Sequence, residues 1–167
     1  HPETIIDNIQ RMASQGKKMV IGTTGWYEHM DSVKQVVENN KTALVWGGNF
    51  SLGVNVFFSL VETAAKLMNN FTAYDLFVFE AHHREKADSP SGTAKMLGDI
   101  LVDNLERKKG IVDDAFRRKP NDDELHVASL RSGSITGQHL VGFDSTADCI
   151  ELKHTAKNRQ GFALGAL

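Results

Sequence analysis

The sequence predicts an α/β fold in which a small parallel sheet precedes an α+β domain. Residues 1–48 alternate between helical and strand-like patterns, and strands that are joined through helices run parallel. After residue 49 two long helical stripes are followed by three strand-like runs with short connections, which favour antiparallel pairing. We therefore expect two domains, residues 1–48 and residues 49–167.

Composition and charge exclude several classes of protein. The chain has 167 residues, 41% of them hydrophobic, and a net charge of −2, so it can form a core and is not disordered. Cys149 is the single cysteine, which excludes a disulfide framework. No apolar run approaches the roughly 20 residues of a membrane span, and the balanced charge offers no basic surface for nucleic acid. We expect a soluble cytoplasmic protein that binds neither membranes nor nucleic acid.

In the first domain, a helix is expected to begin at Pro2 and to stop at Gly16. Its apolar residues recur at helical spacing and are Ile5, Ile6, Ile9, Met12 and Ala13. Short apolar strands over residues 18–21 and 42–46 flank a second helix. The apolar face of that helix consists of Met30, Val33 and Val37. Loops at the carboxyl ends of parallel strands form a crevice that binds ligands.

In the second domain, one long helix is followed by a strand over residues 74–81 and by a second helix around Ala94–Leu105. The apolar stripe of the long helix consists of Val54, Phe57, Phe58, Val61, Ala65 and Met68, which is typical of core packing. The strand-like runs over residues 125–131, 134–143 and 148–153 predict an antiparallel meander, so we expect a mixed, mostly antiparallel sheet in this domain. This sheet has apolar residues on both faces, and one helical layer covers one face, so we expect a partner subunit on the other.

The densest polar cluster, residues 80–94, contains the start of a helix. Ser89 or Ser91 can cap this helix, Pro90 suits its first turn, and Gly92 leaves backbone N–H groups unshielded. The N-terminus of a helix binds carboxylate or phosphate through these N–H groups and the helix dipole.

Groups that transfer protons near pH 7 precede this helix start. A strand delivers His82 and His83 to the loop, and Lys86 follows them. An anion-binding helix start beside proton donors predicts a site for an anionic substrate that is protonated during the reaction.

Each feature also has an ordinary structural interpretation. A Ser-Pro-Ser-Gly-Thr run is common at capped helices, and a His-His pair in a loop is often structural or solvated. A metal site is not predicted, because His82 and His83 are adjacent and lack a ligand spacing. The remaining candidates lie on separate strands, where we do not expect them to converge: His126, His139 and His154.

The whole chain resembles one enzyme family. Residues 80–94, Glu-Ala-His-His-Arg-Glu-Lys-Ala-Asp-Ser-Pro-Ser-Gly-Thr-Ala, closely resemble the signature of dihydrodipicolinate reductases. Further segments that match this family follow the same order along the chain: residues 20–26, 49–55, 129–133, 137–139, 154–159 and 162–166.

The resemblance implies NAD(P)H-dependent reduction of 4-hydroxy-tetrahydrodipicolinate to tetrahydrodipicolinate. It implies that His82 is the proton donor and acceptor and that Lys86 is its partner. The substrate-binding residues implied by the family are His83, Ser91, Gly92, Thr93 and Arg159. The residues implied for NADH or NADPH are Gly22, Thr23, Thr24, Gly48, Asn49, Phe50 and Ser51. The resemblance also implies a Rossmann-like first domain and a homotetramer assembled through the sheet of the second domain.

Two departures from the family pattern affect this interpretation. Ser89 stands where the family has alanine, which the loop should tolerate. The sequence also contains no Gly-x-Gly-x-x-Gly turn to hold a pyrophosphate, so we expect a partial enzyme, truncated at the N-terminus and slightly at the C-terminus. Two alternatives stay open: a non-catalytic oligomerisation module that binds dicarboxylates, and a reductase-like relative that acts on another small dicarboxylate.

Overall fold

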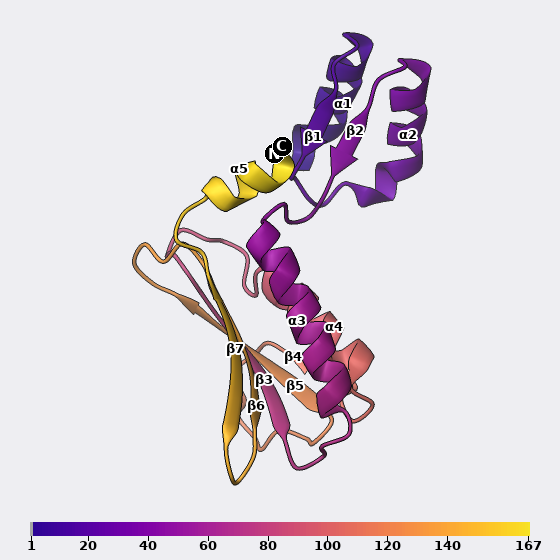
Figure 1. The fold of residues 1–167 in the computed structure, drawn as a ribbon. Helices are drawn as coiled ribbons and strands as arrows, with labels where there is room; N and C mark the ends of the chain where they lie inside the picture. The colour runs from indigo at the N-terminus through magenta and orange to yellow at the C-terminus, as the bar shows by residue number, and fades with distance from the viewer. Residues whose placement is uncertain (1) are drawn as a thin grey trace. The chain divides into compact units, whose positions relative to one another are not determined.

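The structure, a computed structural model, describes residues 2–167 (Figure 1). The chain forms two compact units, which are described separately below. The first unit runs to Phe50 and takes in Ala166 and Leu167, and the second comprises Ser51–Gly165.

The first unit is a two-stranded parallel sheet with two α-helices. Its elements are the 3-10 turn Pro2–Thr4, α1 (Ile5–Ser14), β1 (Met19–Ile21), the 3-10 turn Tyr27–His29, α2 (Met30–Asn39) and β2 (Leu44–Trp46). The helix expected to begin at Pro2 therefore begins three residues later, after a tighter turn. β1 and β2 pair in parallel, as their connection through α2 predicts.

A small apolar core holds this unit together. Its buried residues are Ile5, Ile9, Ile21, Trp26 and Val33. The indole Nε1–H of Trp26 donates to the carbonyl of Thr23 at 2.7 Å, which satisfies the polar atom of this buried side chain.

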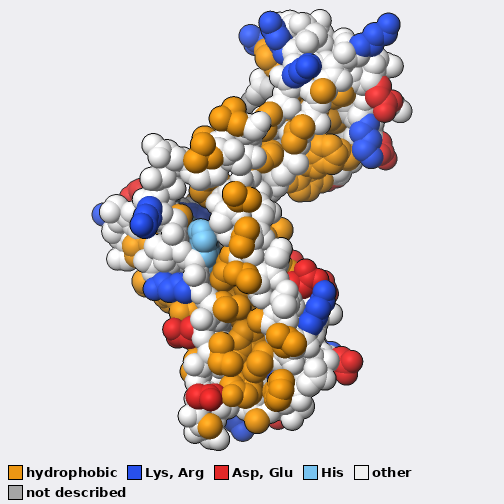
Figure 2. All heavy atoms as spheres, viewed as in Figure 1, with side chains coloured by type: hydrophobic (Ala, Val, Ile, Leu, Met, Phe, Trp, Pro, Cys, Tyr) orange, Lys and Arg blue, Asp and Glu red, His pale blue; other side chains and the backbone are white. Residues whose placement is uncertain are grey.

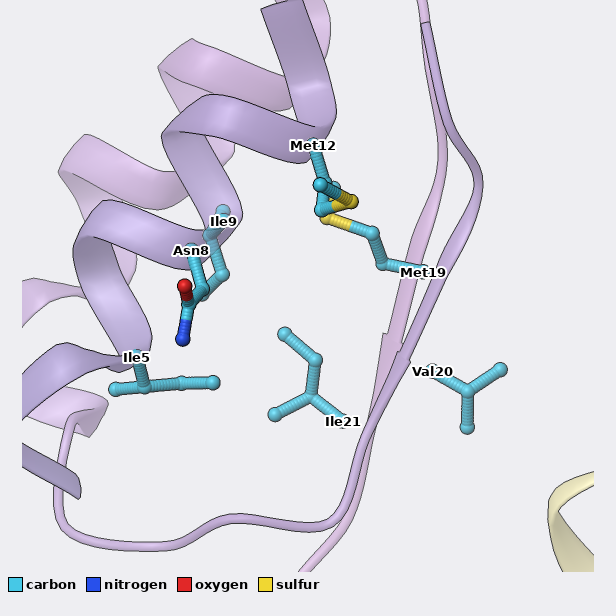
Figure 3. A pocket seen from close by; sticks show the side chains of 7 residues that line it. All are labelled: Ile5, Asn8, Ile9, Met12, Met19, Val20 and Ile21. Carbon is cyan, nitrogen blue, oxygen red and sulfur yellow. The ribbon is translucent and has the colours of Figure 1, made fainter. Parts of the chain in front are cut away.

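A pocket of about 190 Å³ lies between α1 and β1 (Figure 3). Its lining is apolar except for one amide and consists of Ile5, Asn8, Ile9, Met12, Met19, Val20 and Ile21. This lining carries no charge and no proton-transfer group, so it does not suit an anionic ligand.

The second unit is a five-stranded mixed sheet with two long helices. Its elements are α3 (Leu52–Met68), β3 (Asp75–His82), α4 (Gly92–Asn104), β4 (Gly110–Val112), β5 (Glu124–Arg131), β6 (Gln138–Asp144), β7 (Cys149–Thr155) and α5 (Gln160–Ala166). The strand order is β4-β5-β3-β6-β7. The sequence did not predict β4 or α5.

The expected three-stranded meander is wrong in one respect. β6 and β7 form the antiparallel hairpin, but β3 lies between β5 and β6, and β5 runs parallel to β3. α4 carries the chain from β3 to the edge strand β4, and residues 113–123 then lead to β5, which lies between β4 and β3. The connection over residues 132–137 only has to span two strand spacings of about 4.8 Å, which six residues reach easily. A short connection therefore did not require neighbouring strands.

The main core lies between α3, α4 and one face of this sheet (Figure 1). Its residues from α3 are those of the predicted apolar stripe, and Leu97 and Leu101 of α4 join them. On β3 the side chains alternate, so Leu76 and Val78 face the helices. Glu80 and His82 continue this face, which turns from apolar to polar toward the end of the strand.

Several large apolar side chains of α3 stay exposed, and they gather along the outward face of this helix (Figure 2). They are Leu52, Val56, Leu60 and Leu67. Across residues 2–167, the helices all lack the length or the apolar character that crossing a membrane requires.

Candidate active site

The candidate site begins where β3 ends. His82 is buried, with 8% of its surface exposed, whereas the next residue, His83, is half-buried. Because successive strand residues face opposite sides, the two imidazoles leave the sheet in different directions. His82 shares its face with Glu80, whose side chain is completely buried.

The start of α4 lies against this face. Ser91 is the N-cap, and its hydroxyl accepts a hydrogen bond from the N–H of Ala94 at 3.2 Å. Of the two serines predicted as caps, Ser91 therefore has this role. Pro90 precedes the cap, so its predicted place in the first turn is wrong. Gly92 opens the helix and has open space where a side chain would begin.

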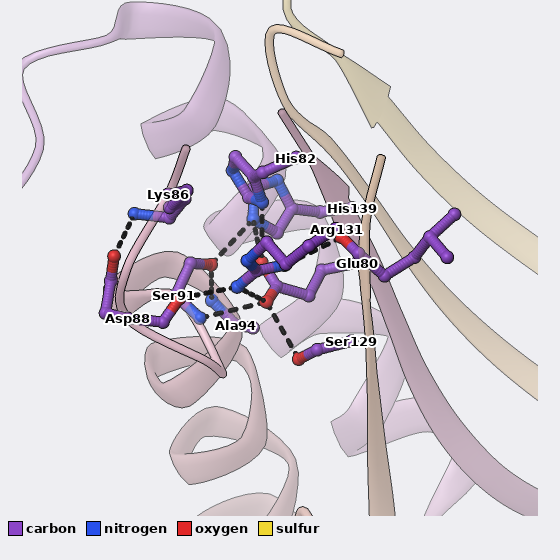
Figure 4. Close-up of polar contacts among 10 residues, drawn as sticks. Glu80, His82, Lys86, Asp88, Ser91, Ala94, Ser129, Arg131 and His139 are labelled. Carbon is purple, nitrogen blue, oxygen red and sulfur yellow. Dashed lines mark hydrogen bonds and ion pairs between the residues drawn. The ribbon is translucent and has the colours of Figure 1, made fainter. Parts of the chain in front are cut away.

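Glu80 lies at the centre of a polar cluster (Figure 4). Its Oε1 accepts hydrogen bonds from the backbone N–H of Ser91 at 3.0 Å and from the hydroxyl of Ser129 at 2.8 Å. The same oxygen accepts from Nη2 of Arg131 at 2.6 Å. The other oxygen, Oε2, lies 2.8 Å from Nδ1 of His82.

Two further histidines lie across the sheet from Glu80. Pairing of β3, β6 and β7 aligns Glu80 with His139, and His139 with His154. The His139 ring meets the His82 ring edge to face at 5.1 Å between centroids, and its Nε2 lies 3.2 Å from the Ser91 hydroxyl. The expectation that these histidines do not converge is therefore wrong for His139. His126 does lie elsewhere, against the ring of Phe116.

Burial and charge shift the pKa values in this cluster. Burial would raise the pKa of Glu80, but hydrogen bonds from Ser91, Arg131 and Ser129 outweigh it and lower the pKa to about 2. Burial, together with the nearby His82, lowers the pKa of His139 to about 4. Glu80 is therefore an anion and His139 a neutral imidazole near pH 7.

The pKa of His82 is lowered by burial, and this outweighs the opposing effect of Glu80. Lys86 and Arg131 lower the same pKa further through their charges, while Asp88 raises it. At neutral pH this imidazole is mainly unprotonated, so it is able to accept a proton and to return it.

Lys86 and Arg159 lie less centrally. The ammonium of Lys86 pairs with Asp88 at 2.6 Å, and no hydrogen bond joins it to His82 within the described part of the chain. Arg159 is exposed just before α5, and among residues 2–167 it makes no ion pair with the cluster. Thr93 lies half-buried in the first turn of α4.

The residues expected to contact a nicotinamide come together in part. Within the first unit, Gly22 follows β1 and Gly48 follows β2, at the same edge of the parallel sheet. A side chain on Gly22 would touch the Phe50 ring at 3.7 Å, and one on Gly48 would touch Thr24 at 3.8 Å. Thr23 lies in the same loop as Gly22, and Asn49 adjoins Gly48. Ser51, from the second unit, caps α3 by accepting from Val54 N–H at 3.4 Å.

The edge formed by these two loops fits the nicotinamide end of a dinucleotide. Gly22, Thr24 and Gly48 are exposed there, so backbone groups at the carboxyl ends of two parallel strands are accessible.

The sequence reasoning assigned no role to Glu80, Ser129, Arg131 or His139. One signal was present, because Glu80 and His82 are two residues apart in a strand and must share a face. Ser129, Arg131 and His139 contact Glu80 because β5 and β6 pair with β3. The sequence prediction placed β5 beside β6, so these contacts could not be predicted.

Glu80, His82 and His139 place potential metal-ligating atoms within 4.8 Å of one another. The guanidinium of Arg131 already neutralises Glu80, and a cation bound there would lie beside this fixed positive charge. The donor set fits a hydrogen-bonded network better than a metal centre.

Comparison with known proteins places this arrangement in a family. Residues 1–50 match the family model described as "Dihydrodipicolinate reductase, N-terminus", and residues 53–167 match that described as "Dihydrodipicolinate reductase, C-terminus". A 4-hydroxy-tetrahydrodipicolinate reductase of Christiangramia forsetii (strain DSM 17595 / CGMCC 1.15422 / KT0803) is 37% identical over 99% of this chain, which spans 68% of that relative.

The fold also matches a solved structure, a dipicolinate-bound dihydrodipicolinate reductase from Paenisporosarcina sp. TG-14. The TM-score is 0.69 at 23% identity, and the match covers 99% of this chain and 63% of that one. The chain therefore spans about two thirds of the length of these relatives. On the family models and the identity to the curated relative, it belongs to the dihydrodipicolinate reductase family.

Proposed function

We propose that this chain is part of an enzyme that reduces 4-hydroxy-tetrahydrodipicolinate to tetrahydrodipicolinate in lysine and diaminopimelate biosynthesis. In this reaction NAD(P)H supplies a hydride, the substrate takes up a proton, and water is lost. Family membership supports the reaction class. The observation that supports it most within the molecule is that the N-cap of α4 and a buried imidazole both contact Glu80.

His82 is the proposed proton donor and acceptor, and Lys86 is its proposed partner. His82 is neutral at physiological pH, and a general acid–base group of this kind contributes about 10²- to 10⁴-fold to a rate. Lys86, now paired with Asp88, has a flexible side chain that can turn to a bound substrate.

A dicarboxylate substrate needs two anion-binding groups. The first turn of α4, with Ser91, Gly92 and Thr93, is proposed to hold one carboxylate, because helix N-termini favour anions. His83 and Arg159 are proposed to contact the substrate further, and a guanidinium suits a carboxylate through its two parallel N–H groups. Dipicolinate, the dicarboxylate in the solved relative, has the same two carboxyl groups.

The nicotinamide, when bound, supplies the hydride. The loops around Gly22, Thr23 and Thr24, with those from Gly48 to Ser51, are proposed to hold it. This sequence contains no Gly-x-Gly-x-x-Gly turn for the pyrophosphate. The loops named above therefore do not decide between NADH and NADPH.

We also propose that the protein is cytoplasmic and forms a homotetramer through the sheet of the second unit. On the sheet face opposite the helices, Leu130 is 44% exposed and Phe77, Phe79 and Leu140 are only half-buried, which suits an interface more than solvent. Sedimentation of the chain at micromolar concentration should give a mass several times 18.5 kDa. A stable monomer would contradict the assembly and leave the reaction unaffected.

The reaction is tested in the complete protein by NAD(P)H oxidation with freshly prepared substrate. His82→Gln should lower kcat by about 10²- to 10⁴-fold with little change in substrate affinity, whereas Arg159→Ala should mainly weaken substrate binding. If the wild-type protein binds the dicarboxylate without turnover, the oligomerisation module is the better description. If the protein turns over another small dicarboxylate in preference, it is better described as a reductase-like relative that acts on that compound.

A further inference from the structure

Glu80 is a fully buried carboxylate that follows two apolar residues on its strand face. Leu76 and Val78 precede it on the same face of β3, with 4% and 0% of their surfaces exposed. A buried charge is costly unless it is paired and hydrogen-bonded, so its partners indicate what it does.

The two oxygens of Glu80 have different partners. Oε1 accepts from Ser91, Ser129 and Arg131, which satisfies and neutralises the carboxylate. Oε2 receives no hydrogen bond of normal geometry from residues 2–167, and Nδ1 of His82 is likewise without one. These two atoms lie 2.8 Å apart, so a small rotation of the imidazole directs Nδ1–H at Oε2.

This arrangement determines which ring nitrogen of His82 is available. With Nδ1 next to an anion, the proton of the neutral ring belongs on Nδ1, and Nε2 keeps its lone pair. Nε2 lies toward Gly137, where a side chain would begin only 3.1 Å away. The glycine therefore leaves room at the nitrogen that exchanges the proton.

Glu80 also connects the imidazole to the helix start. Its Oε1 accepts from the N–H of Ser91, the residue whose hydroxyl caps α4 and contacts His139. One carboxylate thus contacts both the proton-transfer group and the first turn that binds the substrate anion.

We propose that Glu80 is a positioning residue that fixes the tautomer and orientation of His82 and holds the first turn of α4 at a set distance from it. This role rests on the proposed function, in which His82 transfers the proton. Glu80 itself does not touch the substrate.

The first test uses nitrogen-15 NMR to determine which ring nitrogen of His82 carries the proton. It is done on the 167-residue chain, without substrate or cofactor. In the wild-type protein the neutral ring should carry its proton on Nδ1. Glu80→Gln should mix the two tautomers and lower the protonation constant of His82 at least tenfold, because Lys86 and Arg131 remain while the anion is lost. Asp88 and His139, which also face this ring, are unchanged in the variant.

The control is Glu124→Gln on the neighbouring strand β5. Glu124 also pairs with an arginine, Arg118, and its pKa is also lowered to about 2, through hydrogen bonds from Arg118 and Asn121. Its substitution should leave the tautomer of His82 unchanged. If Glu80→Gln does not fold, the wild-type spectrum still decides, because a ring protonated on Nε2 overturns the proposal.

The second test uses the complete reductase. Glu80→Gln should lower kcat about 100-fold and move the limb of the pH profile that follows protonation of His82 to lower pH, and Glu124→Gln should do neither. An unchanged profile with a normal kcat would overturn the positioning role even if the tautomer is as expected. A wild-type protein without reductase activity would instead refute the proposed function, and the NMR measurement would then decide the role of Glu80 alone.

Discussion

Single residues of the polar cluster make the stability of this protein dependent on pH. The unfolded chain protonates a histidine near pH 6.5, but the folded protein does not protonate His139 until the pH falls to about 4. Stability contributed by neutral His139 is therefore present above pH 6.5 and is lost as the pH falls toward 4. The lowered pKa of Glu80 adds a second loss, which begins near pH 4.5 and is complete near pH 2.

Each group should change the free energy of unfolding by about 3 kcal/mol across its window. Urea unfolding followed by circular dichroism at a series of pH values measures this dependence. His139→Gln should reduce the slope between pH 6.5 and 4, to which the lowered pKa of His82 also contributes, and leave the lower window in place. His126→Gln, on the same sheet but against Phe116, should keep both windows. An equal slope in the His139 variant and the wild type would contradict this account.

A second residue-scale prediction concerns Gly137. Its Cα faces the His82 ring, and an added methyl group would lie 3.1 Å from Nε2 and 3.4 Å from Cδ2. The His82 ring has little room to yield, because Glu80 lies against its other nitrogen. Gly137→Ala should therefore cost about 1 kcal/mol of stability and lower kcat at least tenfold.

Gly110→Ala provides a matched control for Gly137→Ala. Gly110 opens β4, and a side chain there would meet nothing within 4 Å. This variant should keep the wild-type kcat. A Gly137→Ala enzyme with normal turnover would show that Nε2 is not the nitrogen that transfers the proton.

The site residues that could be predicted from the sequence are those that belong to a local pattern of neighbouring residues. His82 and Ser91 stand at the end of a strand and the start of a helix, both of which are local patterns. Arg131 and His139 are part of the site only because β5 and β6 flank β3, and this pairing joins residues about 50 positions apart. Local patterns carry no information about such pairing.

At the scale of elements, the start of α4 connects the turn proposed to bind the substrate anion to the core. Ser91 both caps the helix and contacts His139, so Ser91→Ala removes two interactions. We expect a loss of about 1 to 2 kcal/mol in stability, measured by thermal or urea unfolding. Dicarboxylate affinity should fall as well, because the first turn is no longer held.

Ser89→Ala is the control for the cap. Ser89 is exposed and lies two residues before the N-cap, so its loss should change neither stability nor affinity. If both serine variants behave alike, the capping interaction of Ser91 contributes little to the site.

The helices were predicted better than the sheet for a physical reason. The apolar stripe of α3 repeats with a helical period along 17 consecutive residues, so it needs no information from elsewhere in the chain. The place of β5 beside β3 instead depends on two connections, because α4 carries the chain across the sheet to β4 and residues 113–123 bring it back to β5. β4 has only three residues and pairs only with β5, so its own sequence is a weak signal.

At the scale of the whole molecule, the two units have cores of very different size. The second unit buries a continuous cluster from α3, α4 and three strands, whereas the core cluster of the first has five buried residues around a sheet of two three-residue strands. Two-stranded sheets are only marginally stable unless packing supports them. The first unit should therefore have a lower local stability than the second.

Native-state hydrogen exchange measures this difference. Amides of β3, β5 and β6 should exchange only by global unfolding of the second unit, and those of β1 and β2 should exchange through openings of lower free energy. Dipicolinate should slow exchange further in β3 and the first turn of α4, and its stabilisation should reach about 2.7 kcal/mol at a hundredfold excess over Kd. Benzoate, with one carboxylate, should protect much less. If dipicolinate slows exchange equally in both units, or only in β1 and β2, the dicarboxylate site does not lie beside Glu80.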